Sequence, residues 1–146
     1  MDKLTDSLIE VACARHAHSA NRTFCMALGI ELPEWDDLDS QEKQKLHNIV
    51  EFVLAGGTAE SKHVIWCQRM REDGWQYGPR RDNIEKLNPM LVKWEELPHT
   101  QQAREELQVA SIRLMALVLG HSKTPYETKT MHLDLVPESH KEEVGS

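Results

Sequence analysis

Helical periodicity is the feature of this sequence that most constrains its fold. In four separate stretches, apolar or small residues recur at steps of three and four, which is the spacing of side chains on one face of an α-helix. These stretches are residues 6–28, the segment between Asp39 and Gly56, the segment between Thr58 and Gly74, and residues 99–119. The sequence therefore predicts a mainly α fold built on four helices.

The predicted helices carry signals at their ends. Asp6, Asp39 and Thr58 have side chains that can accept hydrogen bonds from the unpaired N–H groups of a first helical turn. Asp39 is followed three positions later by Glu42, which is the spacing of a capping box. At the other ends stand glycines, which readily adopt the left-handed conformation that terminates helices: Gly29, Gly56, Gly74 and Gly120.

The segment between the third and last predicted helices, residues 75–94, has no helical period. Because it contains turn-forming pairs and a short apolar run, we predict an ordered loop with a short β element of two strands. We assign residues 1–120 to one domain and residues 121–146 to a C-terminal tail that is mobile or pairs with a neighbouring subunit. Residues 131–135 of this tail alternate apolar and polar side chains, as an added edge strand would.

The composition excludes several classes of protein. The chain has 146 residues with 17 basic and 24 acidic side chains, which give a formal net charge of −7. This charge argues against a long nucleic acid as partner, because duplex binding draws most of its affinity from many phosphate contacts. No apolar run reaches the roughly 18 residues of a membrane helix, and the N-terminus lacks the layout of a secretory signal. We therefore expect a cytoplasmic protein without a membrane partner, whose three cysteines are free thiols.

Aromatic rings and arginines gather in the middle of the chain. An exposed ring can stack on a base, and a guanidinium group can bind phosphate oxygens through two parallel hydrogen bonds. This combination indicates a small phosphorylated ligand. Trp66 and Trp94 can also be interpreted as core residues, and the arginines as a solvated basic face. The residues concerned are Trp66, Arg69, Arg71, Trp75, Tyr77, Arg80, Arg81 and Trp94.

Motifs for catalysis or metal binding are incomplete in this sequence. His63 and Cys67 stand four residues apart, as metal ligands can, but no second HxxxH or CxxC motif completes a tetrahedral site. Neither the GxSxG motif of a nucleophilic serine nor the GxxxxGKS loop that cradles phosphates occurs. We therefore predict no catalytic residue, no metal and no cofactor, and a protein that is not an enzyme.

A specific motif runs through the same region. The His-x-x-Trp of residues 63–66 precedes Asp-Gly-Trp-Gln-Tyr-Gly-Pro-Arg-Arg-Asp at 73–82, Asn-Pro-Met-Leu-Val at 88–92 and Glu-Leu-Pro at 96–98. These residues resemble the RyR domain, the repeat first named in ryanodine receptors, which bacteria and bacteriophages also encode as stand-alone proteins. Residues 20–29 are similar to the first helix of the phage type, so the likeness covers roughly residues 7–119. The resemblance implies a mainly helical fold with a short β element before the last helix.

The resemblance also implies a function. In the receptors the repeats belong to the cytosolic assembly of a calcium-release channel, and an adenine nucleotide can occupy one repeat pair. In prokaryotes the domain occurs beside defence systems that use nucleotide signals. We therefore expect a non-enzymatic binding protein for a nucleotide-derived small molecule. A phage could use it as a sponge in the host cytosol, where it would sequester a cyclic oligonucleotide or an ADP-ribose derivative of the host defence.

The family's recurring polar and aromatic positions give a candidate binding site. We expect Arg22 and Arg80 to hold phosphate and Trp75 or Tyr77 to stack on the base. Asn88 stands where relatives usually have a histidine, which removes an imidazole from that position. The complete set of candidate ligand-binding residues is Asn21, Arg22, His63, Trp66, Trp75, Tyr77, Gly78, Arg80 and Asn88.

Other members of this set have different expected roles. Asn21, His63 or Asn88 would read hydrogen-bonding edges of the ligand. Gly78 would allow the backbone to approach the ligand closely, since it has no side chain.

Two other functions compete with this hypothesis. The first is a protein–protein interaction module that uses the last helix and the acidic surface and has no small-molecule ligand. The second, weaker alternative is a phosphodiesterase-like enzyme that acts on the same messengers. Independently of function, we expect a homo-oligomer, because the apolar surface of residues 99–119 extends beyond one helix face.

Overall fold

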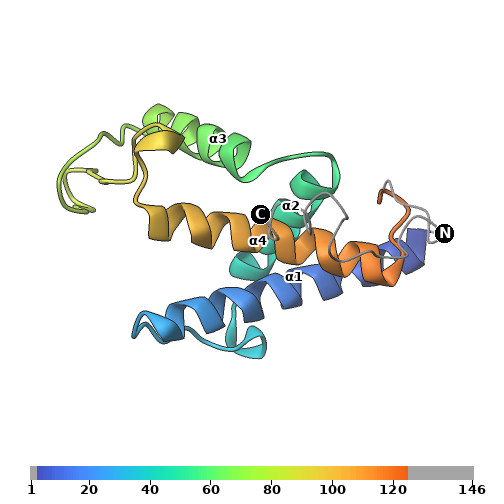
Figure 1. Cartoon of the computed structure of the whole chain (residues 1–146). Helices are drawn as coiled ribbons and strands as arrows, with labels where there is room; N and C mark the ends of the chain where they lie inside the picture. Colours follow the sequence, from blue (N-terminus) through green and yellow to red (C-terminus); the bar gives the residue numbers. More distant parts are fainter. Residues whose placement is uncertain (1–2, 125–146) are drawn as a thin grey trace, which may run out of the picture.

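The computed structural model describes residues 3–124 of the chain, and this part is mainly helical (Figure 1). The four helices predicted from the periodicity are present in it, which confirms the fold class. Their bounds are Lys3–Ala27 for α1, Ser40–Leu54 for α2, Ala59–Glu72 for α3 and His99–Leu119 for α4, with short 3-10 turns at Trp35–Asp37 (η1) and Trp94–Glu96 (η2). A bilayer-crossing helix is not found among these residues. Residues 131–135, for which we predicted an edge strand, lie outside the described range.

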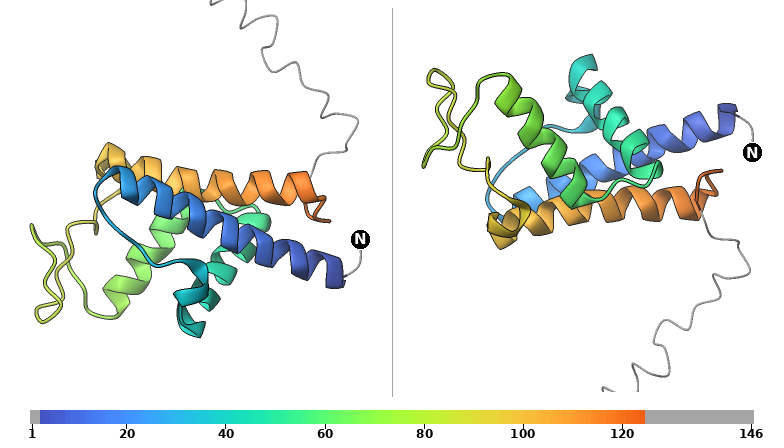
Figure 2. Two further views of the ribbon diagram at one scale, coloured as in Figure 1. Left: turned by 90° about the horizontal axis from the view of Figure 1, so that it is seen from below. Right: turned by 90° about the horizontal axis from the view of Figure 1, so that it is seen from above.

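The two longest helices, α1 and α4, run side by side in opposite directions (Figures 1 and 2). Arg104 near the start of α4 donates a hydrogen bond to Asn21 near the end of α1, at 2.7 Å. α2 packs on both helices, and α3 packs on α4. Small side chains let α1 approach its neighbours closely. The buried core consists of Ile9, Cys13, Ala14 and Ala17 from α1, Val50 and Val53 from α2, Ala59 from α3, and Val109, Ile112 and Ala116 from α4.

Two of the three predicted N-terminal caps are confirmed. The Asp39 carboxylate accepts a hydrogen bond from the Glu42 N–H at 2.8 Å, and Thr58 forms a capping box with Ser61. The third prediction is wrong, because α1 already begins at Lys3 and Asp6 lies inside its first turn. The predicted stop of α4 is confirmed, since Gly120 adopts the left-handed conformation with a φ of 76°.

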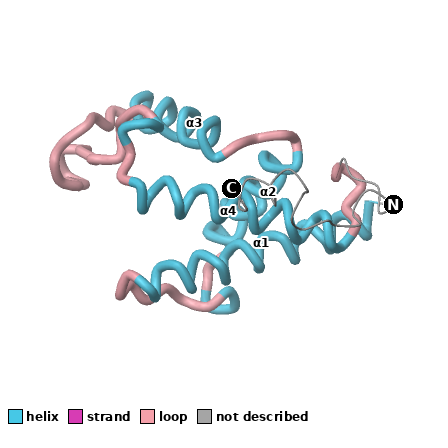
Figure 3. Tube along the Cα trace, viewed as in Figure 1, coloured by secondary structure: helices cyan, strands magenta, loops and turns pink. Residues whose placement is uncertain are grey.

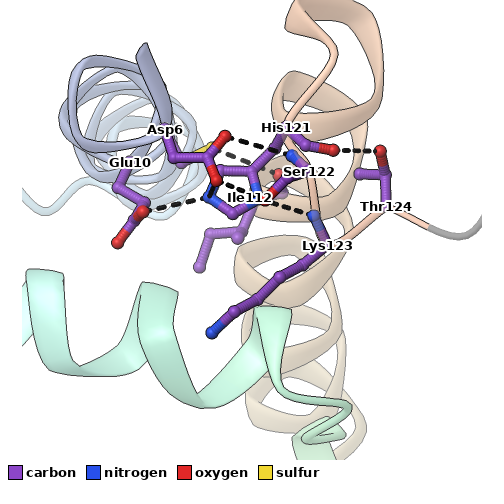
Figure 4. Close-up of polar contacts among 8 residues, drawn as sticks. Asp6, Glu10, Ile112, His121, Ser122, Lys123 and Thr124 are labelled. Atoms are coloured by element: carbon purple, nitrogen blue, oxygen red, sulfur yellow. Dashed lines mark hydrogen bonds and ion pairs between the residues drawn. The ribbon is translucent and has the colours of Figure 1, made fainter. Parts of the chain in front are cut away.

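Asp6 has a different role, which is to join the two ends of the described chain (Figure 4). Its carboxylate accepts hydrogen bonds from the backbone N–H and the hydroxyl of Ser122. Beside it, the buried His121 donates from Nε2 to the Glu10 carboxylate at 3.0 Å, while its Nδ1 accepts from the Lys123 N–H. Residues 121–123, which we assigned to the C-terminal tail, are therefore held against α1 by these contacts.

The connection between α1 and α2 is fastened to both helices. His18 donates from Nε2 to the Pro33 carbonyl at 2.7 Å, and Arg22 donates from Nε to the Leu32 carbonyl at 3.1 Å. The Trp35 ring packs edge-on between His18 and His47, with ring centroids 6.3 and 6.1 Å away. This tryptophan closes one side of the core.

The segment between α3 and η2 is an ordered loop, as predicted, drawn as such in Figure 3. The predicted short β element is limited to isolated bridges, which pair Leu87 with Gln76 and with Asp82. Asp82 also accepts hydrogen bonds from the backbone N–H groups of Ile84 and Glu85, which closes a tight turn at the loop tip. The two strands are absent from the described residues because each pairing extends over too few residues to form a ladder.

Candidate ligand-binding cleft

A cleft with a volume of about 1020 Å³ lies between α2, α3, α4 and the long loop. Both α3 and α4 turn a polar face toward it, and Asn21 is the contribution of α1. Its lining consists of Asn21, Lys45, Asn48, Ile49, Glu51, Phe52, Lys62, His63, Ile65, Trp66, Arg69, Arg81, Asn88, Pro89, Met90, Leu97, Gln101, Arg104, Glu105 and Gln108. A smaller hollow of about 310 Å³ lies at the end of α1 and includes Arg22.

The lining of the cleft is positively charged, in contrast to the chain as a whole. Its ionised side chains are Lys45, Lys62, Arg69, Arg81 and Arg104 against Glu51 and Glu105, a formal excess of three positive charges. The complete chain has a formal net charge of −7. Because a concave surface of one sign concentrates ions of the opposite sign, the cleft favours an anion.

The five cations differ in how far neighbouring groups already satisfy them. Lys62 forms an ion pair with Glu105 and a hydrogen bond with Gln108, and Arg104 donates from Nε to Asn21. By contrast, the exposed side chains of Lys45 and Arg69 make no hydrogen bond or ion pair with any described residue. These two cations are therefore available to an anionic ligand.

Arg81 is held at the mouth of the cleft by the loop itself. Its Nε donates to the Asn83 side chain at 3.1 Å, and its guanidinium carbon lies 5.9 Å from the centre of the Trp75 ring. The terminal amino groups of the guanidinium group, Nη1 and Nη2, make no hydrogen bond with a described residue. A planar cation positioned in this way can bind a phosphate through two parallel hydrogen bonds.

The aromatic part of the lining is organised by His63. This buried side chain donates from Nε2 to the Val92 carbonyl at 2.7 Å, which ties α3 to the end of the loop. The His63 ring stacks on the half-buried Trp66, with centroids 5.7 Å apart and planes at 26°. His63 therefore orients the indole of Trp66, which is the tryptophan that lines the cleft.

Amide side chains supply donors and acceptors around the ring. Asn88 is buried, and its Oδ1 accepts a hydrogen bond from the Met90 N–H at 2.9 Å, which shapes the turn at residues 88–90. Gln101 donates to Glu105 at 3.0 Å and fixes that carboxylate. Asn48 and Gln108 complete this set. Such groups can recognise the hydrogen-bonding edge of a base.

The structure brings four of the nine predicted ligand-binding residues together in the cleft. These are Asn21, His63, Trp66 and Asn88. The other five lie elsewhere. Arg22 lines the smaller hollow and donates a hydrogen bond to the Leu32 carbonyl. On the loop, the Tyr77 side chain is 59% exposed and Gly78 is buried. Four residues of the loop do not line the cleft: Trp75, Tyr77, Gly78 and Arg80.

Several lining residues were missed by the sequence reasoning although a pattern for them exists. Gln101, Arg104, Glu105 and Gln108 follow the steps of one helical face, so they form a polar stripe on α4. We interpreted α4 only through its apolar residues. Arg80 was chosen because it matches a recurring position of the RyR resemblance, whereas the structure places its neighbour Arg81 in the cleft.

Comparison with known protein families adds a decisive observation. The sequence model of the RyR domain matches residues 43–125, which is more than half of the chain. The chain belongs to the RyR domain family. The matched part of this RyR protein contains α3, the loop, α4 and most of α2, and it holds every lining residue except Asn21. The cleft of this protein is thus formed by the matched segment, to which α1 adds a single side chain.

Proposed function

We propose that this RyR protein binds a nucleotide-derived small molecule in the cleft and releases it unchanged. The observation that carries this proposal is the excess of positive charge around Trp66 in a protein that is acidic overall. Phosphate groups would meet Lys45, Arg69 and Arg81, and the base would lie against the indole. The amides would then distinguish one base edge from another.

The size of the cleft suits a ligand larger than a mononucleotide. Pockets for drug-sized molecules have volumes of roughly 300–1000 Å³, and this cleft is at the upper end of that range with about 1020 Å³. A cyclic oligonucleotide or an ADP-ribose derivative fits that class. Long nucleic acids do not, because the chain has a formal net charge of −7 and duplex binding needs many phosphate contacts. A phage that encodes such a protein could use it as a sponge for an immune messenger.

Thermal denaturation with candidate ligands tests this proposal directly. The protein is mixed with cyclic dinucleotides, cyclic trinucleotides and ADP-ribose derivatives in turn, and its melting temperature is recorded. A ligand present at a hundred times its Kd stabilises the folded state by about 2.7 kcal/mol, so the melting temperature of the complex should rise by several degrees. If none of these compounds raises it, sequestration of this class is wrong. Mass spectrometry after heat release distinguishes binding from turnover, since an altered mass means catalysis.

Two adjacent arginines provide a matched pair of variants. Arg81→Ala removes a cation from the cleft, whereas Arg80→Ala removes the same group from an exposed position outside it. We expect Arg81→Ala to raise the Kd of the ligand about tenfold or more, because a charge-assisted hydrogen bond is lost. Arg80→Ala should leave the Kd within about twofold. Titration calorimetry of both variants measures this difference, and equal effects would place the phosphate elsewhere.

The alternative function, a protein–protein interaction module without a small-molecule ligand, has one observation in its favour. On α4, Leu114 is 56% exposed and Val118 is 69% exposed. If partner binding is the function, Leu114→Glu should abolish it while Arg81→Ala leaves it intact. If the cleft binds a ligand, Arg81→Ala should weaken ligand binding and Leu114→Glu should leave it intact.

A further inference from the structure

The outer face of α4 carries a heptad pattern that no other described element covers. Apolar residues follow one another at alternating steps of four and three, which is the spacing of the a and d positions of a coiled coil. They are Ala103, Leu107, Ala110, Leu114 and Leu117, called here the α4 seam. The two alanines and Leu114 are exposed, and the two other leucines are partly exposed. In both views of Figure 2, α4 runs along one edge of the molecule.

The α4 seam is separate from the surfaces that α4 uses for folding and for the cleft. The buried side of α4 presents Val109, Ile112 and Ala116 to the core. A second side lines the cleft through Arg104 and Gln108. The seam is the remaining side, and neither the fold nor the proposed function accounts for its exposed Leu114 and the partly exposed leucines beside it.

Two charged residues flank the seam at equivalent positions. Glu106 and Arg113 are seven residues apart, so both occupy the g position of the heptad, and both are exposed. In an antiparallel pair of identical helices, g positions of the two copies meet across the interface. Glu106 of one copy then faces Arg113 of the other, and two-fold symmetry forms this opposite-charge pair twice.

The alignment that joins these charges also matches the sizes of the side chains in the seam. It places Leu107 against Ala110 of the second copy and Leu114 against Ala103. Leu117 falls against Thr100 in the same alignment. Each large residue therefore meets a small one, as close packing requires.

Other alignments lose this complementarity. A shift of one heptad sets Arg113 against Arg113 in one direction, or Glu106 against Glu106 in the other. A parallel pair would place Glu106 beside Ser111 of the second copy and leave both charges without a partner. We propose that a second copy of this chain covers the α4 seam, in an antiparallel homodimer with paired Glu106 and Arg113.

Charge reversal provides the first test. Glu106→Arg and Arg113→Glu each create like-charge contacts in their own homodimers, so each variant alone should dimerise with a Kd raised about tenfold. Mixing the two restores both opposite-charge pairs, and the mixture should associate as tightly as the wild type in sedimentation equilibrium. Glu72→Arg, an equal charge change at an exposed position on α3, is the matched control and should have no effect. A wild-type chain that stays monomeric, or a mixture no tighter than its components, overturns the proposal.

Disulfide trapping tests the orientation and does not depend on Arg113, which also donates to the Gly57 carbonyl. The native Cys13, Cys25 and Cys67 are buried and will not interfere. Ala103→Cys mixed with a size-tagged Leu114→Cys should give a cross-linked heterodimer on oxidation, while Ala103→Cys alone should give little product. Efficient self-linking of Ala103→Cys would indicate a parallel pair and would contradict the antiparallel dimer. Failure of the mixture to cross-link would do the same.

Discussion

At the scale of single residues, His63 connects three parts of the fold through one imidazole ring. Its Nε2 donates a hydrogen bond to the Val92 carbonyl, and its face stacks on the Trp66 ring. The centroid of the Trp94 ring lies 6.1 Å from the centroid of the imidazole. Because the ring has a fixed partner on the loop, it cannot rotate freely toward a ligand. We conclude that His63 positions Trp66, whereas the sequence analysis named it as one of three residues that could read the ligand.

Cys13 illustrates how burial controls thiol chemistry. The side chain is fully buried between α1 and α4, and burial, with a smaller contribution from Glu10, raises the pKa of its thiol to about 11. At pH 8 only about one thiol in a thousand is ionised, so alkylation should be far slower than for a free cysteine. Iodoacetamide labelling followed by peptide mass spectrometry measures this rate, with the urea-unfolded chain as reference. Rapid labelling of Cys13 in the folded protein would contradict its burial.

At the scale of elements, the long loop depends on a close contact at Gly78. A Cβ atom built on this glycine would lie 2.7 Å from the Cβ of Leu87 and 3.0 Å from its Cδ1. Gly78 is therefore needed for packing within the loop, whereas we had expected it to admit a ligand. Gly78→Ala should lower the free energy of unfolding by about 1–3 kcal/mol, as overpacking does. Urea unfolding followed by circular dichroism measures the loss, and the exposed Arg80→Ala should show almost none.

The helices could be predicted from the sequence because their signals are local. The apolar period, the caps at Asp39 and Thr58, and Gly120 all act within a few residues of the element that they define. The loop could not be predicted to the same extent. Its course depends on backbone hydrogen bonds that join Gln76 to Lys86 and Asn88, which are ten and twelve residues away. Arg81 lines the cleft and Arg80 does not.

The same distinction applies to the candidate site. His63 and Trp66 were found because the motif of α3 places them on one helical turn. Arg104 could not be assigned, since its partner Asn21 is 83 residues away in the sequence and only the packing of α1 against α4 brings them together. Residues of this kind become visible as a site only when helix packing is known.

At the scale of the whole molecule, the contact of Asp6 with Ser122 links stability to pH. Hydrogen bonds from the Ser122 hydroxyl and backbone N–H lower the pKa of Asp6 below its ordinary value of 3.8. A carboxyl group whose pKa is lower in the folded than in the unfolded protein stabilises the fold fully at a pH above its unfolded pKa. This stabilisation is lost as the pH falls through its folded pKa. The free energy of unfolding should therefore decrease below about pH 4.

Asp6→Asn separates this contribution from general acid denaturation. The variant should be less stable than the wild type at neutral pH, and its stability should fall less steeply below pH 4. Asp37→Asn is the control, because the exposed Asp37 side chain makes no hydrogen bond or ion pair with a described residue. Urea unfolding at a series of pH values provides the comparison. Parallel curves for Asp6→Asn and the wild type would show that the ionisation of Asp6 does not contribute to stability.

The packing of α1 against α4 has a consequence for how this protein can be shortened. The matched segment begins at residue 43, after α1 has ended. A fragment trimmed to that segment would lose Cys13 and Ala17, and the buried side of Ile112 and Ala116 would be open to water. In this protein the matched segment is therefore smaller than the unit that shares the buried core, and boundaries for its expression should be set at the start of α1.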